Sequence, residues 1–183
     1  MSIAKLVIGL IAGAAATSAA AQSTDTSEVF EVTGNVPGLC SIGSLGTDDG
    51  IFALGTLIDL STGRLRNDLS APLKVLADAF CTSRSSITIE ATPLESQNSS
   101  DAPEGFARAV HYTATASGWT DAAASFDTAA TTNPAATQAR ATAFQGDISV
   151  AIDDFRTQGG DNLLLIADPS YLGAVTVTLT AAD

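Results

Sequence analysis

Residues 29–40 read VFEVTGNVPGLC and end in one of the two cysteines of the chain. Phe30, Val32 and Val36 alternate with polar residues, which is the two-residue period of a half-buried β-strand. We therefore predict that this stretch is the first strand of a β-domain and that it leads directly into Cys40.

The second cysteine, Cys81, closes another apolar run, residues 73–80. An even number of cysteines in an exported chain favours a structural disulfide, so we predict a Cys40–Cys81 bond. It would close a loop of about 40 residues, for which chain entropy gives roughly 4 kcal/mol of stabilisation. A reactive or metal-binding thiol pair is the weaker reading, because there is no CxxC motif and His111 is the single histidine.

The first 21 residues have the three parts of a secretory signal peptide. Lys5 supplies a positive charge, Leu6–Ala16 is apolar, and small residues up to Ala21 form a cleavage site. The apolar part is shorter than the roughly 20 residues that a spanning helix needs. We predict export, cleavage after Ala21, no membrane span in the remaining chain, and a single domain over residues 22–183.

The chain is strongly acidic. It has 8 Lys and Arg against 20 Asp and Glu, and a formal net charge of −12. Removal of residues 1–21 takes away Lys5 and no acid, which leaves 7 − 20 = −13. Such a surface repels phosphate backbones and anionic lipids, so nucleic-acid binding is not expected.

Further strand candidates are rich in branched apolar residues and are bounded by turn residues. They are residues 51–57, 73–80, 86–92, 107–116, 147–152, 163–166 and 174–180. Short strands separated by Gly, Pro, Asn and Asp favour an all-β, antiparallel sandwich over alternating βαβ units.

Two stretches interrupt this pattern. Residues 95–105 are polar and turn-rich, which indicates an exposed loop. Residues 119–143 are rich in Ala, Thr and Asp. We predict a loop with turns there in preference to a short helix after Pro134, because threonine and proline disfavour helix.

No catalytic or metal motif is well formed. A serine triad would have to use His111, which lies in an alternating strand pattern, and no GxSxG surrounds any serine. The acid pairs Asp48-Asp49 and Asp153-Asp154 are best read as solvated loop charge. Calcium has oxygen ligands available in the turns, but no complete DxDxDG pattern. We expect no enzyme, cofactor or metal.

Four segments resemble the subunits of archaic chaperone–usher pili and the spore coat protein U-like domains. They are Phe30–Val36 followed by Cys40-Ser41-Ile42, then Phe52–Leu57, Leu73–Cys81, and the closing Tyr171–Leu179. The likeness covers essentially the whole chain after the leader, in layout.

The resemblance implies an immunoglobulin-like sandwich that lacks its last strand. A periplasmic chaperone fills the gap first, and the N-terminal extension of a neighbouring copy or related subunit fills it later. In this chain, residues 22–36 would be that extension, overlapping the first strand, with Phe30, Val32, Gly34 and Val36 as donor residues. The implied partners are the chaperone and an outer-membrane usher, and the implied location is a surface fibre or coat that serves adhesion and biofilm formation.

Two other functions fit the same sequence. One is a self-complete secreted β-sandwich that binds a ligand as a monomer, which a count of eight strands would favour. The other is a secreted hydrolase, which ranks last because it depends on His111.

Overall fold

The structure, a computed structural model, describes residues 26–98 and 100–182. The chain divides into two units, Met1–Asn35 and Val36–Asp183. In the first unit, the described residues 26–35 form neither helix nor strand, and all are exposed. The second unit is an all-β domain without a helix among its described residues. In the described part of the chain, no helix has the length and apolar character to cross a membrane.

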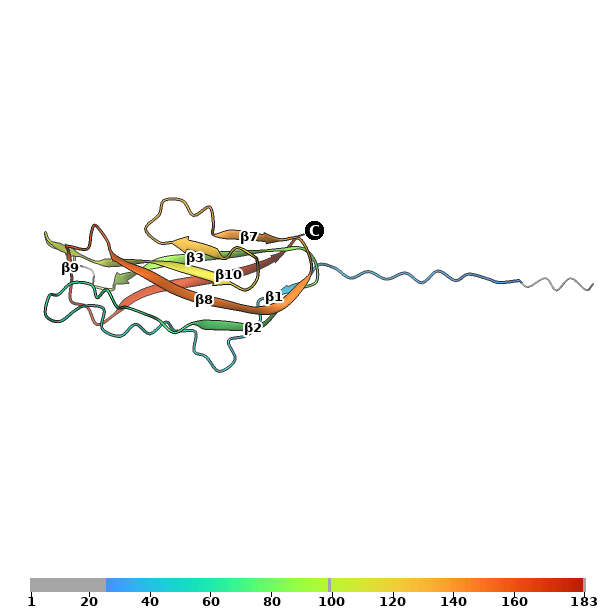
Figure 1. The fold of residues 1–183 in the computed structure, drawn as a ribbon, viewed down its shortest axis with the longest axis horizontal. Coiled ribbons are helices and arrows are strands. Elements are labelled where there is room, and N and C mark those ends of the chain that lie inside the picture. Colours follow the sequence, from blue (N-terminus) through green and yellow to red (C-terminus); the bar gives the residue numbers. More distant parts are fainter. Residues whose placement is uncertain (1–25, 99, 183) are drawn as a thin grey trace, which may run out of the picture. The chain divides into compact units, whose positions relative to one another are not determined.

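The described residues of the domain form ten strands, and Figure 1 shows the domain as a ribbon. They are β1 Cys40–Ser41, β2 Lys74–Cys81, β3 Ser85–Ser96, β4 Phe106–Ala107, β5 Ala109–Ser117, β6 Ala124–Asp127, β7 Thr137–Arg140, β8 Phe144–Thr157, β9 Leu164–Leu165 and β10 Tyr171–Ala181. Eight of them form one antiparallel sheet in the order β1-β2-β8-β5-β3-β10, with β6 beside β5 and β7 beside β3. The other two, β4 and β9, pair in parallel.

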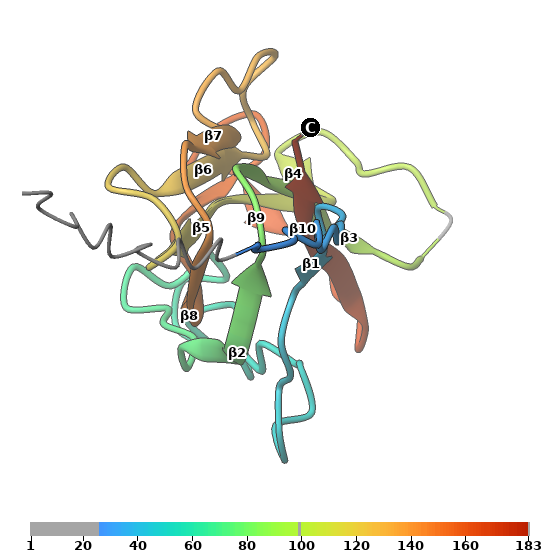
Figure 2. The ribbon, with the colours of Figure 1, turned by 90° about the vertical axis from the view of Figure 1, so that its right-hand side faces the viewer.

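The large sheet curls around one interior and nearly closes. Figure 2 shows β1 between β2 and β10. The two end strands, β1 and β10, are in contact. Just before β1, a Cβ atom on Gly38 would lie 3.6 Å from the Cβ of Ala181 at the end of β10. No ladder joins β1 to β10 among the described residues.

The core consists of alternate residues from the long strands, as their two-residue period requires. Ile87 and Ile89 from β3, Tyr112 from β5 and Ile148 from β8 are fully buried. Trp119 joins them, and its ring meets that of Phe144 edge-on with the ring centroids 5.2 Å apart. All-β architecture is therefore confirmed.

The predicted Cys40–Cys81 disulfide is present, and the two residues face each other in the β1–β2 ladder. The bond ties the start of the domain to the end of β2.

The first strand predicted over residues 29–40 is wrong except at its last residue, Cys40. Residues 26–39 belong to no strand, and β1 is only Cys40–Ser41. The alternating pattern meets the local requirement for a strand. A strand also needs a hydrogen-bonded neighbour, and within the described residues none pairs with this segment.

The strands predicted over residues 51–57 and 163–166 are also wrong, the first entirely and the second in length. Residues 51–57 are in no strand, although Phe52 and Leu54 are half-buried and alternate with exposed residues. The second segment shortens to the two residues of β9.

The loop predicted over residues 119–143 contains β6 and β7, so that prediction is wrong in part. Their sequences, Ala-Ser-Phe-Asp and Thr-Gln-Ala-Arg, are too short and too polar to give a clear strand pattern. They form because β5 and β3 offer them ladder partners.

Pro93 does not end its strand, because β3 continues to Ser96. Opposite Pro93, β10 has a register shift between Leu172 and Ala174, where a missing N–H is tolerated. Gly173 makes this possible, because a Cβ there would lie 2.9 Å from the carbonyl oxygens of Thr92 and Pro93.

Candidate functional site

One side of β10 has no paired strand in the part of the chain that the structure describes. Its other side pairs with β3 from Tyr171 to Ala181, but no described strand pairs with the side that faces away from β3. We call this side the open edge. An unpaired edge offers a row of backbone N–H and C=O groups to another chain.

Apolar side chains lie beneath the open edge. Val175, Val177 and Leu179 point inward and pack on the main core, yet they are only half-buried. Between them, Thr176 and Thr178 point outward and are exposed. The edge therefore combines free backbone groups with incompletely covered apolar side chains.

A groove opens at the Tyr171 end of this edge. Its volume is about 760 Å³, and residues 52–58 and 165–172 form its two walls. Phe52 and Leu54 on the first wall pack on the same core as Val175. An extended apolar segment could lie in this groove and continue along β10.

Hydrogen bonds hold the second wall in place. The carboxylate of Asp168 accepts a bond from Ser96 Oγ (2.6 Å) and another from the backbone N–H of Ser170 (2.8 Å). The bond from Ser96 is the main reason why the pKa of Asp168 is lowered. Tyr171 donates its hydroxyl to the carbonyl of Ile166 (2.8 Å). This wall is therefore formed before any ligand arrives.

A buried lysine anchors the loop that leads into the first wall. Lys74 Nζ lies 2.7 Å from Asp48 Oδ1 and 3.3 Å from Asp49 Oδ1, and 6.0 Å from the centre of the Phe52 ring. The hydrogen bond with Lys74 lowers the pKa of Asp48 and raises that of Lys74. Asp48 and Asp49 are thus ion-pair partners, and the prediction that they are merely solvated charge is wrong.

Sequence reasoning missed this ion pair. A lysine at an inward position of β2, inside an apolar run, is the signal that could have drawn attention to it. Its acidic partners lie about 25 residues earlier in the chain and could not be assigned without the fold.

The predicted donor residues lie outside every strand. Phe30, Val32 and Val36 are 86%, 94% and 82% exposed. A Cβ on Gly34 would meet nothing within 4 Å.

The residues considered for catalysis or metal binding are used differently. His111 lies in β5, and its Nδ1 is 3.2 Å from Thr128 Oγ1. Asp154 pairs with Arg156, which also contacts Asp127. In the described ranges, no three His, Cys, Asp or Glu side chains gather closely enough to hold a metal ion.

Comparisons with known proteins give no match. No family model fits the chain, and neither a curated protein nor a solved structure is significantly similar to it.

Proposed function

We propose that this protein is a structural subunit of a surface fibre or coat, and that copies are joined by strand donation. The observation that carries the proposal is the open edge of β10 with its half-buried apolar side chains. In assembled material, residues 29–36 of one copy occupy the open edge of the next.

The donor segment suits the acceptor in length. Eight extended residues at about 3.3 Å each span about 26 Å, and the 11 residues of β10 span about 36 Å. Residues 26–28 can cover much of the remainder. The donor thus reaches along most of the open edge.

The donor segment also suits the acceptor in pattern. Phe30, Val32, Gly34 and Val36 fall on one face of an extended chain. Each large apolar side chain buried there contributes roughly 1.5–3 kcal/mol, and backbone hydrogen bonds add to this. In the separate chain these three apolar side chains are almost fully exposed, so assembly is what buries them.

The order of the strands supports the immunoglobulin-like sandwich that the resemblance implies. In this proposal β1-β2-β8-β5 and β3-β10 are the two layers of an immunoglobulin-like sandwich whose last strand is missing. The missing strand would lie beside β10. Because an uncovered apolar edge promotes aggregation, a periplasmic chaperone would cover it until an outer-membrane usher delivers the subunit.

Surface material sheared from cells tests the proposal. In SDS, unheated samples should give a ladder of multiples of the subunit mass, and boiling should collapse it to one band. One band in both lanes would contradict strand donation and indicate a self-complete monomeric β-sandwich.

A matched pair of variants identifies the donor. Val32→Asp should shorten or abolish the ladder, with at least about a tenfold loss of assembly, because the apolar face would carry a charge. Thr33→Asp places the same charge on the opposite face and should leave the ladder nearly unchanged. Equal ladders from both variants would exclude residues 29–36 as the donor.

A further inference from the structure

The donor segment joins the domain through a sequence that normally forms a turn. Residues 36–39 read Val-Pro-Gly-Leu, and a Pro-Gly pair is a strong turn signal because glycine readily adopts positive φ. In the structure these residues form neither turn nor bend. Gly38 is also not among the glycines with positive φ.

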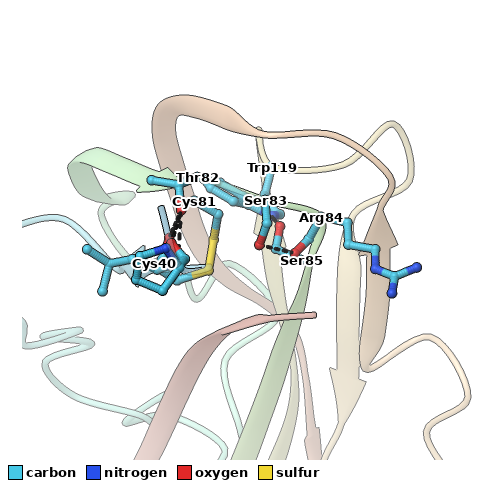
Figure 3. The surroundings of a disulfide bond; sticks show 9 residues. Cys40, Cys81, Thr82, Ser83, Arg84, Ser85 and Trp119 are labelled. Atoms are coloured by element: carbon cyan, nitrogen blue, oxygen red, sulfur yellow. Dashed lines mark hydrogen bonds between the residues drawn. A yellow bond between two sulfur atoms is a disulfide. The ribbon is translucent and has the colours of Figure 1, made fainter. Parts of the chain in front are cut away.

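Thr82 is hydrogen-bonded to residues 37 and 39 in this extended sequence. The Thr82 hydroxyl accepts a hydrogen bond from the backbone N–H of Leu39 (2.9 Å). The backbone N–H of Thr82 donates a second one to the carbonyl of Leu39 (2.8 Å). The same hydroxyl lies 3.3 Å from the carbonyl of Pro37. Figure 3 shows Thr82 beside the Cys40–Cys81 disulfide, with hydrogen bonds of Thr82 as dashed lines. We call these contacts the Thr82 clamp.

The directions of the strands indicate where residues 29–36 would lie if a turn formed at Pro37-Gly38. From β1 to β10 the sheet order has five antiparallel steps, so β10 runs opposite to β1. A turn at Pro37-Gly38 would fold residues 29–36 back beside β1, on the side that faces β10. That segment would then run parallel to β10 in its own domain, whereas the segment of a second copy is free to pair antiparallel, the more stable arrangement.

We propose that the Thr82 clamp keeps the donor segment out of its own open edge and so commits it to a second copy of the chain. This inference rests on the proposed function. Thr82 acts as a positioning residue for assembly. Without the clamp, the Pro-Gly turn forms, the segment covers its own β10, and the subunit becomes a closed monomer.

Thr82→Val tests the clamp, and Thr82→Ser, which keeps the hydroxyl, is the control. Thr82 is exposed and the disulfide remains, so both variants should fold. Loss of the hydroxyl should shift the ratio of open to turned chains by roughly two- to tenfold. Thr82→Val should therefore raise the monomer share of the SDS ladder, and Thr82→Ser should not.

Hydrogen exchange on the monomer fraction distinguishes closure of the chain on its own β10 from a general loss of stability. In the Thr82→Val monomer, the amides of residues 29–36 should be protected to the same degree at every protein concentration. A monomer share that rises without this protection would overturn the proposal, as would equal ladders for the Val and Ser variants.

Gly38→Ala tests whether disfavouring the turn reverses the effect of Thr82→Val. An alanine opposes the positive φ of the turn, and in the open form its Cβ meets mainly the rotatable Ser83 hydroxyl, at 2.8 Å. Added to Thr82→Val, it should restore the ladder and remove the protection. If even the unsubstituted chain gives no ladder, the proposed function fails. The exchange comparison of Thr82→Val with Thr82→Ser then still decides whether the clamp holds the turn open.

Discussion

Tyr112 is the buried polar group that links the centre of the sheet to β10. Its hydroxyl lies within hydrogen-bond distance of the carbonyl oxygens of Thr92 (2.8 Å) and Ala174 (3.1 Å). Burial raises the pKa of Tyr112 to about 12 from an ordinary value of 10.0. The hydroxyl thus ties β10 to the core at the start of its inward-facing apolar row.

This tyrosine predicts a loss of stability in alkali. Because the folded state holds the proton more tightly than the unfolded chain, the contribution of Tyr112 is complete below pH 10 and falls as the pH rises towards about 12. Tyr112→Phe should lower the free energy of unfolding by about 0.5–1.5 kcal/mol at pH 7 and weaken its decline above pH 10. Urea unfolding at pH 7, 9 and 11.5 measures both effects. An unchanged alkaline slope in the variant would contradict this role.

At the scale of single elements, local pattern predicted the long strands but not β6 and β7, although the same chain supplies a partner to each of them. Val175, Val177 and Leu179 alternate, and β10 forms where predicted. Phe30 and Val32 alternate as well, yet no strand forms there. The two segments differ in the presence of a neighbouring strand, which periodicity cannot report.

The candidate site was predictable to a similar extent. The cysteine pair followed from its number and from the expected compartment, since both are properties of the sequence. The open edge depends on the order of strands that are distant in the chain, and the Thr82 clamp joins residues 43 positions apart. Neither leaves a local signal that distinguishes it from ordinary strand and loop sequence.

The close approach of β10 to β3 predicts that replacing Gly173 lowers the stability of the domain. Gly173→Ala places a Cβ 2.9 Å from two carbonyl oxygens, so we expect a loss of about 1–3 kcal/mol through displacement of the backbone. Gly34→Ala is the control, because its Cβ would meet nothing within 4 Å and stability should not change. Thermal unfolding of both variants measures the difference, and equal melting temperatures would show that the bulge tolerates a side chain.

For the whole molecule, charge controls how readily copies meet. With a net charge of −12, or 7 − 20 = −13 without residues 1–21, two copies repel each other over the Debye length, which is about 30 Å at 0.01 M salt and about 8 Å at 0.15 M. Assembly of purified subunits should therefore be faster at 0.15 M salt, because the joining interactions are mainly apolar and backbone contacts. Light scattering at the two concentrations measures the rate. A faster rate at low salt would point to attraction between oppositely charged patches instead.

The Cys40–Cys81 bond has a mechanical consequence for such an assembly. A pull on the segment before Cys40 would otherwise load the two-residue β1, whose few hydrogen bonds would open first. The disulfide instead passes the tension directly to the end of β2 and leaves the residues between the cysteines out of the load path. Because the bonded residues are 41 positions apart in the sequence, about 140 Å of chain cannot be drawn out under force. A fibre of these subunits would therefore not lengthen through the unravelling of residues 41–80.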